Sequence, residues 1–277
     1  MPRVRVNGVE LFYEESGRGP EPIVFSHGLL MDHSMFEPQR AAFESQYRII
    51  AYDHRAQGQS QDPGSGYDME TLANDAAALI EDLHAAPCHF AGLSMGGFVG
   101  MRLASRRPEL VRSLTLMNTG AAAEQWWNRL RYGVLARLVT VVGPSPFIGI
   151  AKKELFGRST RARRDPQQRA MLQSWTAKLK KRPRNVAQSL RGVMNRKEVS
   201  QDELRSIRCP VLILAGQEDI AQPPKYSEQL ARVIPNSRLV RIPSCGHSSS
   251  LESPLEVAEA IRAFLVTTRA KGTGVNK

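Results

Sequence analysis

Over its first 120 residues the sequence alternates between short strand-like runs and helix-like patterns. The strand-like runs cover residues 3–6, 9–15, 23–25, 48–52, 89–92 and 112–117, and the main helical patterns cover 68–86 and 95–106. Strands that alternate with helices pair in parallel, with helices on both faces, so this order predicts a mainly parallel, doubly wound sheet. Asn7-Gly8 between the first two runs predicts a hairpin.

The alternation stops near residue 120 and resumes at residue 209. Between these points no run is strand-like, and residues 124–142, 167–181 and 184–196 have helical patterns. A strand (211–215), a helix (224–233), a strand (238–242) and a helix (253–267) then follow. We therefore predict an α/β core made of residues 1–120 and 209–277, with a helical insertion at 121–208. An insertion after a strand of a parallel sheet lies at the carboxyl edge, so we expect it to form a lid over the site.

The insertion is also the basic part of the chain. The whole sequence has 38 Lys and Arg against 27 Asp and Glu, and 20 of these cations but only 6 of the acids lie between Gly120 and Arg208. We consider three interpretations of this charge, in order of preference. The basic residues form a solvated helical face, or some of the arginines hold a substrate carboxylate. In the third, the insertion docks on nucleic acid or an anionic membrane. Aromatic residues are sparse around the most basic run, 178–184, so we expect no nucleic-acid partner.

The overall composition indicates which class of protein the chain belongs to. With 42% hydrophobic and 23% charged residues, the chain is typical of a globular protein and not of a disordered one. It has no apolar stretch long enough to span a membrane, and its first residues lack the apolar core of a signal peptide. Cys88, Cys209 and Cys245 are far apart, which favours free thiols and a cytoplasmic location. No feature of the sequence predicts an oligomeric state.

The sharpest motif is Gly92-Leu93-Ser94-Met95-Gly96, which lies between a predicted strand and a predicted helix. The pattern G-x-S-x-G in this context indicates a sharp turn that lifts the serine hydroxyl out of the sheet edge. Side chains two residues before and after the serine would collide in such a turn, so both positions are glycine. Ser94 is the candidate nucleophile.

A serine hydroxyl needs a base, and the base needs an orienting carboxylate. Of the six histidines, His247 follows the last predicted strand and so lies at the carboxyl edge, whereas His84 and His89 lie at the opposite edge. Asp219 follows the strand at 211–215 and is the candidate acid. Its neighbour Glu218 is the rival and is expected to point to the other side of the loop.

The oxyanion of an acyl-transfer reaction needs two backbone N–H donors. Met95, the residue after the nucleophile, supplies one. Leu29, in the loop after the strand at 23–25, is expected to supply the second, with Gly28 allowing the chain to turn. His27 in the same loop is interpreted as an orienting residue and not as a second base.

These segments resemble the α/β-hydrolase superfamily over nearly the whole core. The order Ser94, Asp219, His247 is the order of that family's triad. The segment from Asp53 to Ser60 resembles the family loop D-x-R-G-x-G-x-S, except that Ala56 replaces the first glycine, for which we expect a small backbone adjustment. The nucleophile segment and Gln222-Pro223-Pro224 are similar to those of 3-oxoadipate enol-lactonases and small carboxylesterases.

The resemblance implies an eight-stranded α/β-hydrolase sheet with an antiparallel second strand and a helical lid. It implies hydrolysis of a small carboxylic ester or lactone through an acyl-enzyme on Ser94, His247 and Asp219. The alternatives on the same triad are C–C bond hydrolysis and cofactor-free perhydrolysis or acyl transfer. A ligand-binding signalling role is the alternative outside enzymes. Haloalkane dehalogenases and related epoxide hydrolases are excluded, because their nucleophile is an aspartate.

No cofactor or metal is implied. The sequence has no H-E-x-x-H motif, no paired-cysteine ligand set and no G-x-G-x-x-G after a strand. The lid contributes five large aromatic residues, Trp126, Trp127, Phe147, Phe156 and Trp175. Each is expected either to line the acyl pocket or to pack the lid helices on the core.

Overall fold

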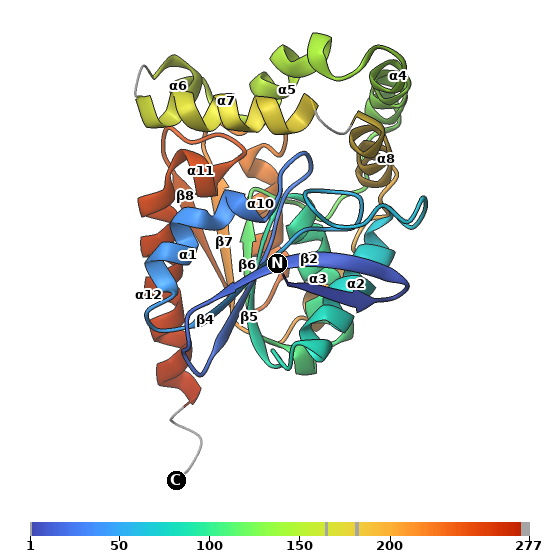
Figure 1. Ribbon diagram of the computed structural model, residues 1–277. Helices are drawn as coiled ribbons and strands as arrows, with labels where there is room; N and C mark the ends of the chain where they lie inside the picture. Colours follow the sequence, from blue (N-terminus) through green and yellow to red (C-terminus); the bar gives the residue numbers. More distant parts are fainter. Residues whose placement is uncertain (1, 164–165, 181–182, 273–277) are drawn as a thin grey trace.

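The computed structural model describes residues 2–163, 166–180 and 183–272. Its centre is an eight-stranded sheet with the strand order β1-β2-β4-β3-β5-β6-β7-β8 (Figure 1). In chain order the strands are β1 Arg3–Val6, β2 Val9–Ser16, β3 Pro22–Ser26, β4 Arg48–Tyr52, β5 Cys88–Leu93, β6 Val111–Met117, β7 Val211–Gly216 and β8 Ser237–Ile242. Strand β2 runs antiparallel to β1 and β4, and the pairs from β4 to β8 are parallel. The predicted sheet with an antiparallel second strand is confirmed.

The β1–β2 hairpin turns where the sequence predicts. Asn7 and Gly8 both have positive φ, 46° and 76°, which matches the twist of a two-residue hairpin. Val6 pairs with Val9 across this turn. The hairpin therefore adds the two outermost strands on one side of the sheet.

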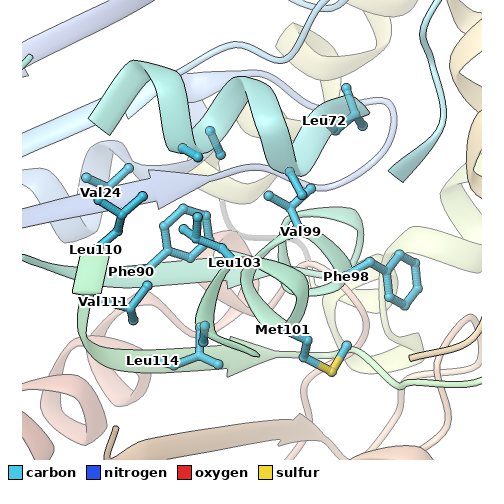
Figure 2. Packing of buried hydrophobic residues seen from close by; sticks show 14 of the residues in the cluster. Val24, Leu72, Phe90, Phe98, Val99, Met101, Leu103, Leu110, Val111 and Leu114 are labelled. Atoms are coloured by element: carbon cyan, nitrogen blue, oxygen red, sulfur yellow. The ribbon is translucent and has the colours of Figure 1, made fainter. Parts of the chain in front are cut away.

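Helices cover both faces of the sheet. The core helices and short 3-10 turns are η1 His33–Phe36, α1 Glu37–Phe43, α2 Met69–Asp82, α3 Met95–Arg106, η2 Pro108–Leu110, α9 Gln201–Ser206, α10 Pro224–Val233, α11 Ser249–Glu252 and α12 Pro254–Gly272. On one face, Leu72 of α2 and Val99 of α3 pack with Val24 and Phe90 of the sheet (Figure 2). Neighbouring strand residues such as Phe25 point to the other face. This alternation follows from the two-residue period of a strand.

Between β6 and β7 the chain forms a layer of helices over one end of the sheet (Figure 1). They are α4 Trp126–Val142, η3 Ser145–Phe147, α5 Ile148–Leu155, α6 Arg158–Ala162, α7 Pro166–Lys180 and α8 Pro183–Met194. The end that they cover is the carboxyl end of the parallel strands, because the loop after β7 contacts α6 through Glu218. Helix α9 instead packs against α3 and α10.

The helix expected over residues 68–86 is shorter in the structure. It ends at Asp82, and His84 has a left-handed φ of 49°, a conformation that stops an α-helix. The last helix is longer than expected and reaches Gly272. The three cysteines are free thiols, as the sequence predicts.

Candidate active site

Ser94 lies at the turn between β5 and α3. Its φ and ψ are 52° and −106°, a strained combination for a residue with a side chain. A Cβ atom on Gly92 would approach the Gly96 carbonyl oxygen to 2.2 Å, and one on Gly96 would approach the Ser26 carbonyl oxygen to 2.0 Å. Both contacts are with backbone, so neither can be relieved by a side-chain rotation. The predicted turn is confirmed, together with the need for glycine on both sides.

His247 and Asp219 meet at the same edge of the sheet. The Nδ1 atom of His247 lies 2.8 Å from Oδ2 of Asp219, and both side chains are buried. A carboxylate oxygen accepts hydrogen bonds, so Nδ1 carries the proton and Nε2 is the nitrogen left for proton transfer. Asp219 is held in turn by Nδ2 of Asn118 at 3.0 Å and by the backbone N–H of Gln222 at 2.8 Å.

The pKa of His247 is above its ordinary value. Burial of the ring lowers the pKa, because it penalises the charged form. The negative charge and hydrogen bond of Asp219 raise it, as does the charge of Glu252, and together they outweigh the burial. An imidazolium at this position is therefore stabilised by its surroundings.

Glu252 is a buried carboxylate directly behind the histidine loop. Its oxygens accept hydrogen bonds from the backbone N–H groups of Gly246 at 3.1 Å and Ser248 at 2.9 Å, which flank His247. A third N–H, that of Gly157 before α6, donates to the same side chain at 2.8 Å. Burial raises the pKa of the Glu252 carboxyl, against the opposing effect of these donors.

Glu218 points away from His247, as expected. Its carboxylate accepts hydrogen bonds from the backbone N–H of Ser159 at 2.7 Å and from the hydroxyl of the same residue at 2.6 Å. Glu218 therefore holds the start of α6, while Asp219 faces the histidine.

The loop after β3 lies against the nucleophile. A Cβ on Gly28 would lie 3.6 Å from Cβ of Ser94 and 3.0 Å from Cδ2 of Leu93, so glycine permits this close approach. The chain turns over residues 28–31, where the Met31 N–H donates to the Gly28 carbonyl oxygen at 3.2 Å and Leu30 has a φ of 64°. Met95 is the first residue of α3, where backbone N–H groups have no partner within the helix.

His27 is fully engaged within this loop. Its Nδ1 lies 2.8 Å from the carbonyl oxygen of Gly28, so this nitrogen carries the proton. Its Nε2 accepts the backbone N–H of His54 at 3.0 Å. Burial lowers the pKa of His27, which keeps the ring neutral. These contacts confirm that His27 orients the loop.

The segment from Asp53 to Ser60 packs against the loop after β3 and is joined to it by hydrogen bonds. One oxygen of Asp53 accepts the backbone N–H of His33 at 2.7 Å, and the other accepts that of Gln59 at 2.7 Å. A Cβ on Gly58 would lie 2.0 Å from the Asp53 carboxylate, so this glycine is required. Ala56, in place of the family glycine, has a φ of 63° and is fully buried. The alanine thus keeps the left-handed conformation that a glycine adopts without strain.

A cavity of about 480 Å³ lies between the loops at residues 30–35 and 56–59 and helix α7. Ser94 does not line this cavity, but Leu30 and Leu251 do. Leu30 follows Leu29 directly, and Leu251 lies four residues after His247, so the cavity adjoins the candidate site. The wall also includes apolar side chains, those of Met31, Met35, Met171, Trp175 and Leu179, and polar ones, those of Asp32, His33, Ser34, Gln57, Gln59, Ser174 and Ser189. Trp175 donates its Nε1–H to the Leu30 carbonyl oxygen at 3.0 Å and packs edge-on against Phe156.

Among the described residues that line this cavity, Lys178 is the one Lys or Arg. Its ammonium lies 2.8 Å from Oδ2 of Asp32 and 2.6 Å from Oγ of Ser34. Of the basic run at 178–184, Lys181 and Arg182 and the side chain of Arg184 lie outside the described part of the chain. The cation nearest the cavity is therefore already neutralised by a carboxylate.

No group of three or more His, Cys, Asp or Glu side chains is placed to hold a metal ion in the part of the chain that the structure describes. Within the same residues, no helix combines the length and the apolar character needed to cross a bilayer.

Sequence reasoning missed two residues of this site, Asn118 and Glu252. Asn118 directly follows β6 at the carboxyl edge, and this position is the one signal that could have drawn attention to it. Trp126 and Trp127 match neither expected role, because both are exposed to solvent. Trp175 lines the cavity and Phe156 is buried against it.

Comparison with known proteins gives matches along nearly the whole chain. A family described as "alpha/beta hydrolase fold" matches residues 21–254. The AB hydrolase superfamily protein YisY of Bacillus subtilis is 30% identical over 265 residues, which are 92% of this chain and 95% of that protein. The structure of a thermophilic esterase from Thermogutta terrifontis superposes with a TM-score of 0.87 at 31% identity, over 97% of this chain and 99% of the other. The enol-lactonase from Burkholderia xenovorans LB400 gives 0.86 at 27%, over 96% and 100%.

Proposed function

The chain belongs to the α/β-hydrolase family, and from this premise we propose that it hydrolyses carboxylic esters or lactones through an acyl-enzyme on Ser94. The observation that carries the proposal is the buried hydrogen bond between His247 Nδ1 and Asp219 Oδ2 at the sheet edge that also carries the strained Ser94. A nucleophile on a strained turn, with a base oriented by a carboxylate, is the arrangement that acyl transfer requires.

In the proposed reaction the Ser94 oxygen attacks the substrate carbonyl while Nε2 of His247 takes the hydroxyl proton. His247 then gives this proton to the leaving alkoxide, and the acyl group stays on Ser94. In the second half, His247 takes a proton from water, whose oxygen attacks the acyl carbon. The bond to Ser94 Oγ then breaks, His247 returns the proton to that oxygen, and the acid is released with the enzyme restored. Asp219 stabilises the imidazolium in both halves.

The negative oxygen of each tetrahedral intermediate is assigned to the backbone N–H groups of Leu29 and Met95. The position of Met95 at the start of α3 supports this role, because the helix dipole favours a negative charge there. The close approach of Gly28 to Ser94 brings the loop that carries Leu29 next to the nucleophile.

For the substrate, we infer a neutral acyl group. Methionine, leucine and tryptophan side chains form one part of the wall of the cavity beside the site, and this part favours an apolar group. A carboxylated substrate would need a cation free to pair with it. Lys178, which is the one Lys or Arg among the described wall residues, is committed to Asp32.

The test is hydrolysis of p-nitrophenyl esters from acetate to decanoate. We expect turnover with an optimum in chain length, and in Ser94→Ala a loss of about four to six orders of magnitude in kcat. Ser105→Ala, at the far end of the same helix, is the matched control and should keep the wild-type rate. Activity of Ser94→Ala close to that of the wild type would refute the assignment of the nucleophile. A folded wild-type protein that turns over neither these esters nor simple lactones would refute the substrate class.

A further inference from the structure

Helix α4 lies at one end of the helical layer (Figure 1), and several of its apolar side chains are exposed to solvent. Trp126, Leu130, Val134 and Leu138 follow one another at intervals of four residues, and each is between 45% and 71% exposed. Trp127, Val141 and Val142 widen this face and are 51%, 82% and 56% exposed. At 100° per residue the seven side chains span an arc of about 160°. We call these seven residues the outer face of α4.

The other side of α4 accounts for the packing of the helix. Ala136 and Val139 are its two buried residues. Ala136 lies in a small apolar cluster with Ala187 and Leu190 of α8. The helix is therefore held by its inner side, and none of the described core packs over its outer face. Contiguous exposed apolar surface of this kind marks an interaction site.

The charges around the outer face indicate what covers it. Helix α4 contains three arginines and no acidic residue. Arg131 and Arg137 lie within the apolar arc, and of these Arg131 forms an exposed pair with Glu154 at 3.3 Å. Arg137 has no ion-pair partner among the described residues. Helix α5, which follows in the chain, carries Lys152 and Lys153 besides Glu154.

Two copies of this face packed together would bring like charges into an apolar contact. An anionic lipid surface instead neutralises the arginines while it takes up the apolar side chains. Tryptophan side chains such as Trp126 and Trp127 are favoured at this boundary, because one part of the ring is apolar and the indole N–H stays hydrated.

We propose that the outer face of α4 docks the protein on an anionic phospholipid surface, with the seven apolar side chains among the lipid headgroups and acyl boundary and the arginines paired with phosphates. The interaction is peripheral and leaves the helix parallel to the surface. It rests on the exposure and charge of α4 and is independent of the reaction assigned to Ser94.

The first experiment is co-sedimentation of the full-length protein with vesicles of phosphatidylglycerol and phosphatidylcholine in equal parts. Vesicles of phosphatidylcholine alone serve as the comparison. We expect binding to the anionic vesicles that weakens with added salt. The double variant Leu130→Gln/Val134→Gln should lower the partition coefficient at least about ten-fold, because both side chains lose their apolar contact with lipid. Arg137→Gln should lower it about five-fold, the share of one cation near an anionic surface.

The matched control is Leu255→Gln/Val266→Gln, which replaces a leucine and a valine on α12 that are 75% and 62% exposed, more than Leu130 and Val134. It should bind like the wild type. Binding to anionic vesicles that survives Leu130→Gln/Val134→Gln unchanged would overturn the proposal, as would the absence of binding. A concentration-dependent dimer in analytical ultracentrifugation that the same double variant abolishes would assign the face to a second copy and also overturn it.

Tryptophan fluorescence adds a direct readout of the contact. Trp126 and Trp127 are exposed, whereas Trp175, the third tryptophan, is buried. Anionic vesicles should shift the emission to shorter wavelength. The variant Trp126→Phe/Trp127→Phe should lose this shift and still co-sediment. A shift that persists in this variant would place the contact elsewhere and refute the docking of α4.

Discussion

At the scale of single residues, the proposed acid depends on a neighbour that comes from another part of the chain. Asn118 donates one amide N–H group to Asp219 and another to the Gly246 carbonyl oxygen, both at 3.0 Å. It thereby ties the loop after β6 to the loops that carry the acid and the base. Asn118 has a φ of 49°, a left-handed conformation that asparagine and glycine tolerate and most other residues do not.

We predict that Asn118→Gly lowers kcat about 10- to 100-fold with little change in KM, because Asp219 loses a hydrogen bond and orients His247 less well. Glycine accepts the positive φ, so the backbone stays unstrained. Steady-state kinetics on the preferred ester give the measurement, and Asn118→Ala separates the two effects by adding strain to the same loss. An unchanged kcat in Asn118→Gly would show that the amide has no part in positioning Asp219.

Glu252 affects both the pKa of His247 and the stability of the loop that carries His247. His247 must be neutral to act as a base, so activity falls as the pH falls through its raised pKa. The charge of Glu252 contributes to that increase. The substitution Glu252→Gln removes the charge and lowers the pKa of His247. The acidic limb of kcat/KM should therefore move to lower pH.

The same substitution should lower the free energy of unfolding by about 1–3 kcal/mol, because an amide cannot accept all three backbone N–H donors that the carboxylate accepts. A pH–rate profile and urea denaturation give the two readouts. An acidic limb at the wild-type pH in a destabilised variant would restrict Glu252 to a structural role.

These two residues also show where sequence reasoning stops. Ser94 has a local signature, and His247 and Asp219 follow strands at one edge, so all three could be predicted from sequence. The contact between Asn118 and Asp219 joins positions 101 residues apart and has no local pattern. In the sequence, Glu252 has the pattern of an ordinary charged residue at a helix end. Its burial depends on contacts with residues far away in the chain, such as Gly157 of the insertion.

At the scale of elements, α7 sets the upper wall of the cavity. Trp175 is its largest buried side chain, and Leu179 lies one turn further along the same wall. We predict that Trp175→Ala moves the optimum of the p-nitrophenyl ester series to longer acyl chains, because the space vacated by the indole adjoins the cavity. Gln173→Ala, at an exposed position of the same helix, is the control and should leave the optimum in place. An unchanged optimum in Trp175→Ala would show that the acyl chain lies elsewhere.

The helices of the insertion were predicted less completely than the strands. The strands of the core have apolar runs bounded by turn residues, and each was predicted to within about two residues. In the insertion, α5 and α6 have eight and five residues, too few for a clear helical period. The side of α4 that faces solvent is decided by its contact with α8, which no local pattern encodes.

At the scale of the whole molecule, the proposed site joins two separate parts of the chain. Ser94 comes from the part before the insertion, and Asp219 and His247 come from the part after it. The two parts are united within the sheet, where Leu114 of β6 pairs with Val211 of β7. The core is thus joined by one continuous sheet, while the insertion is attached to it from α5 to α8, for example by Leu155 and Trp175, which lie in the same buried cluster as Phe25 of the sheet.

This arrangement predicts an uneven distribution of local stability. Helix α3 buries ten of its twelve residues, whereas α4 buries two of seventeen. Local opening exposes less apolar surface in α4, so its amides should exchange with solvent at least about 100-fold faster than those of α3. Hydrogen exchange followed by mass spectrometry measures both helices in one experiment.

The same measurement can be repeated on anionic vesicles. Lipid contact along the outer face adds stability to α4 alone, so its exchange should slow while that of α3 stays constant. Equal protection of α3 and α4 in solution would contradict the predicted distribution. Protection of both helices by vesicles would indicate a general stabilisation of the fold, because a local contact at the end of the helical layer cannot slow the opening of the core.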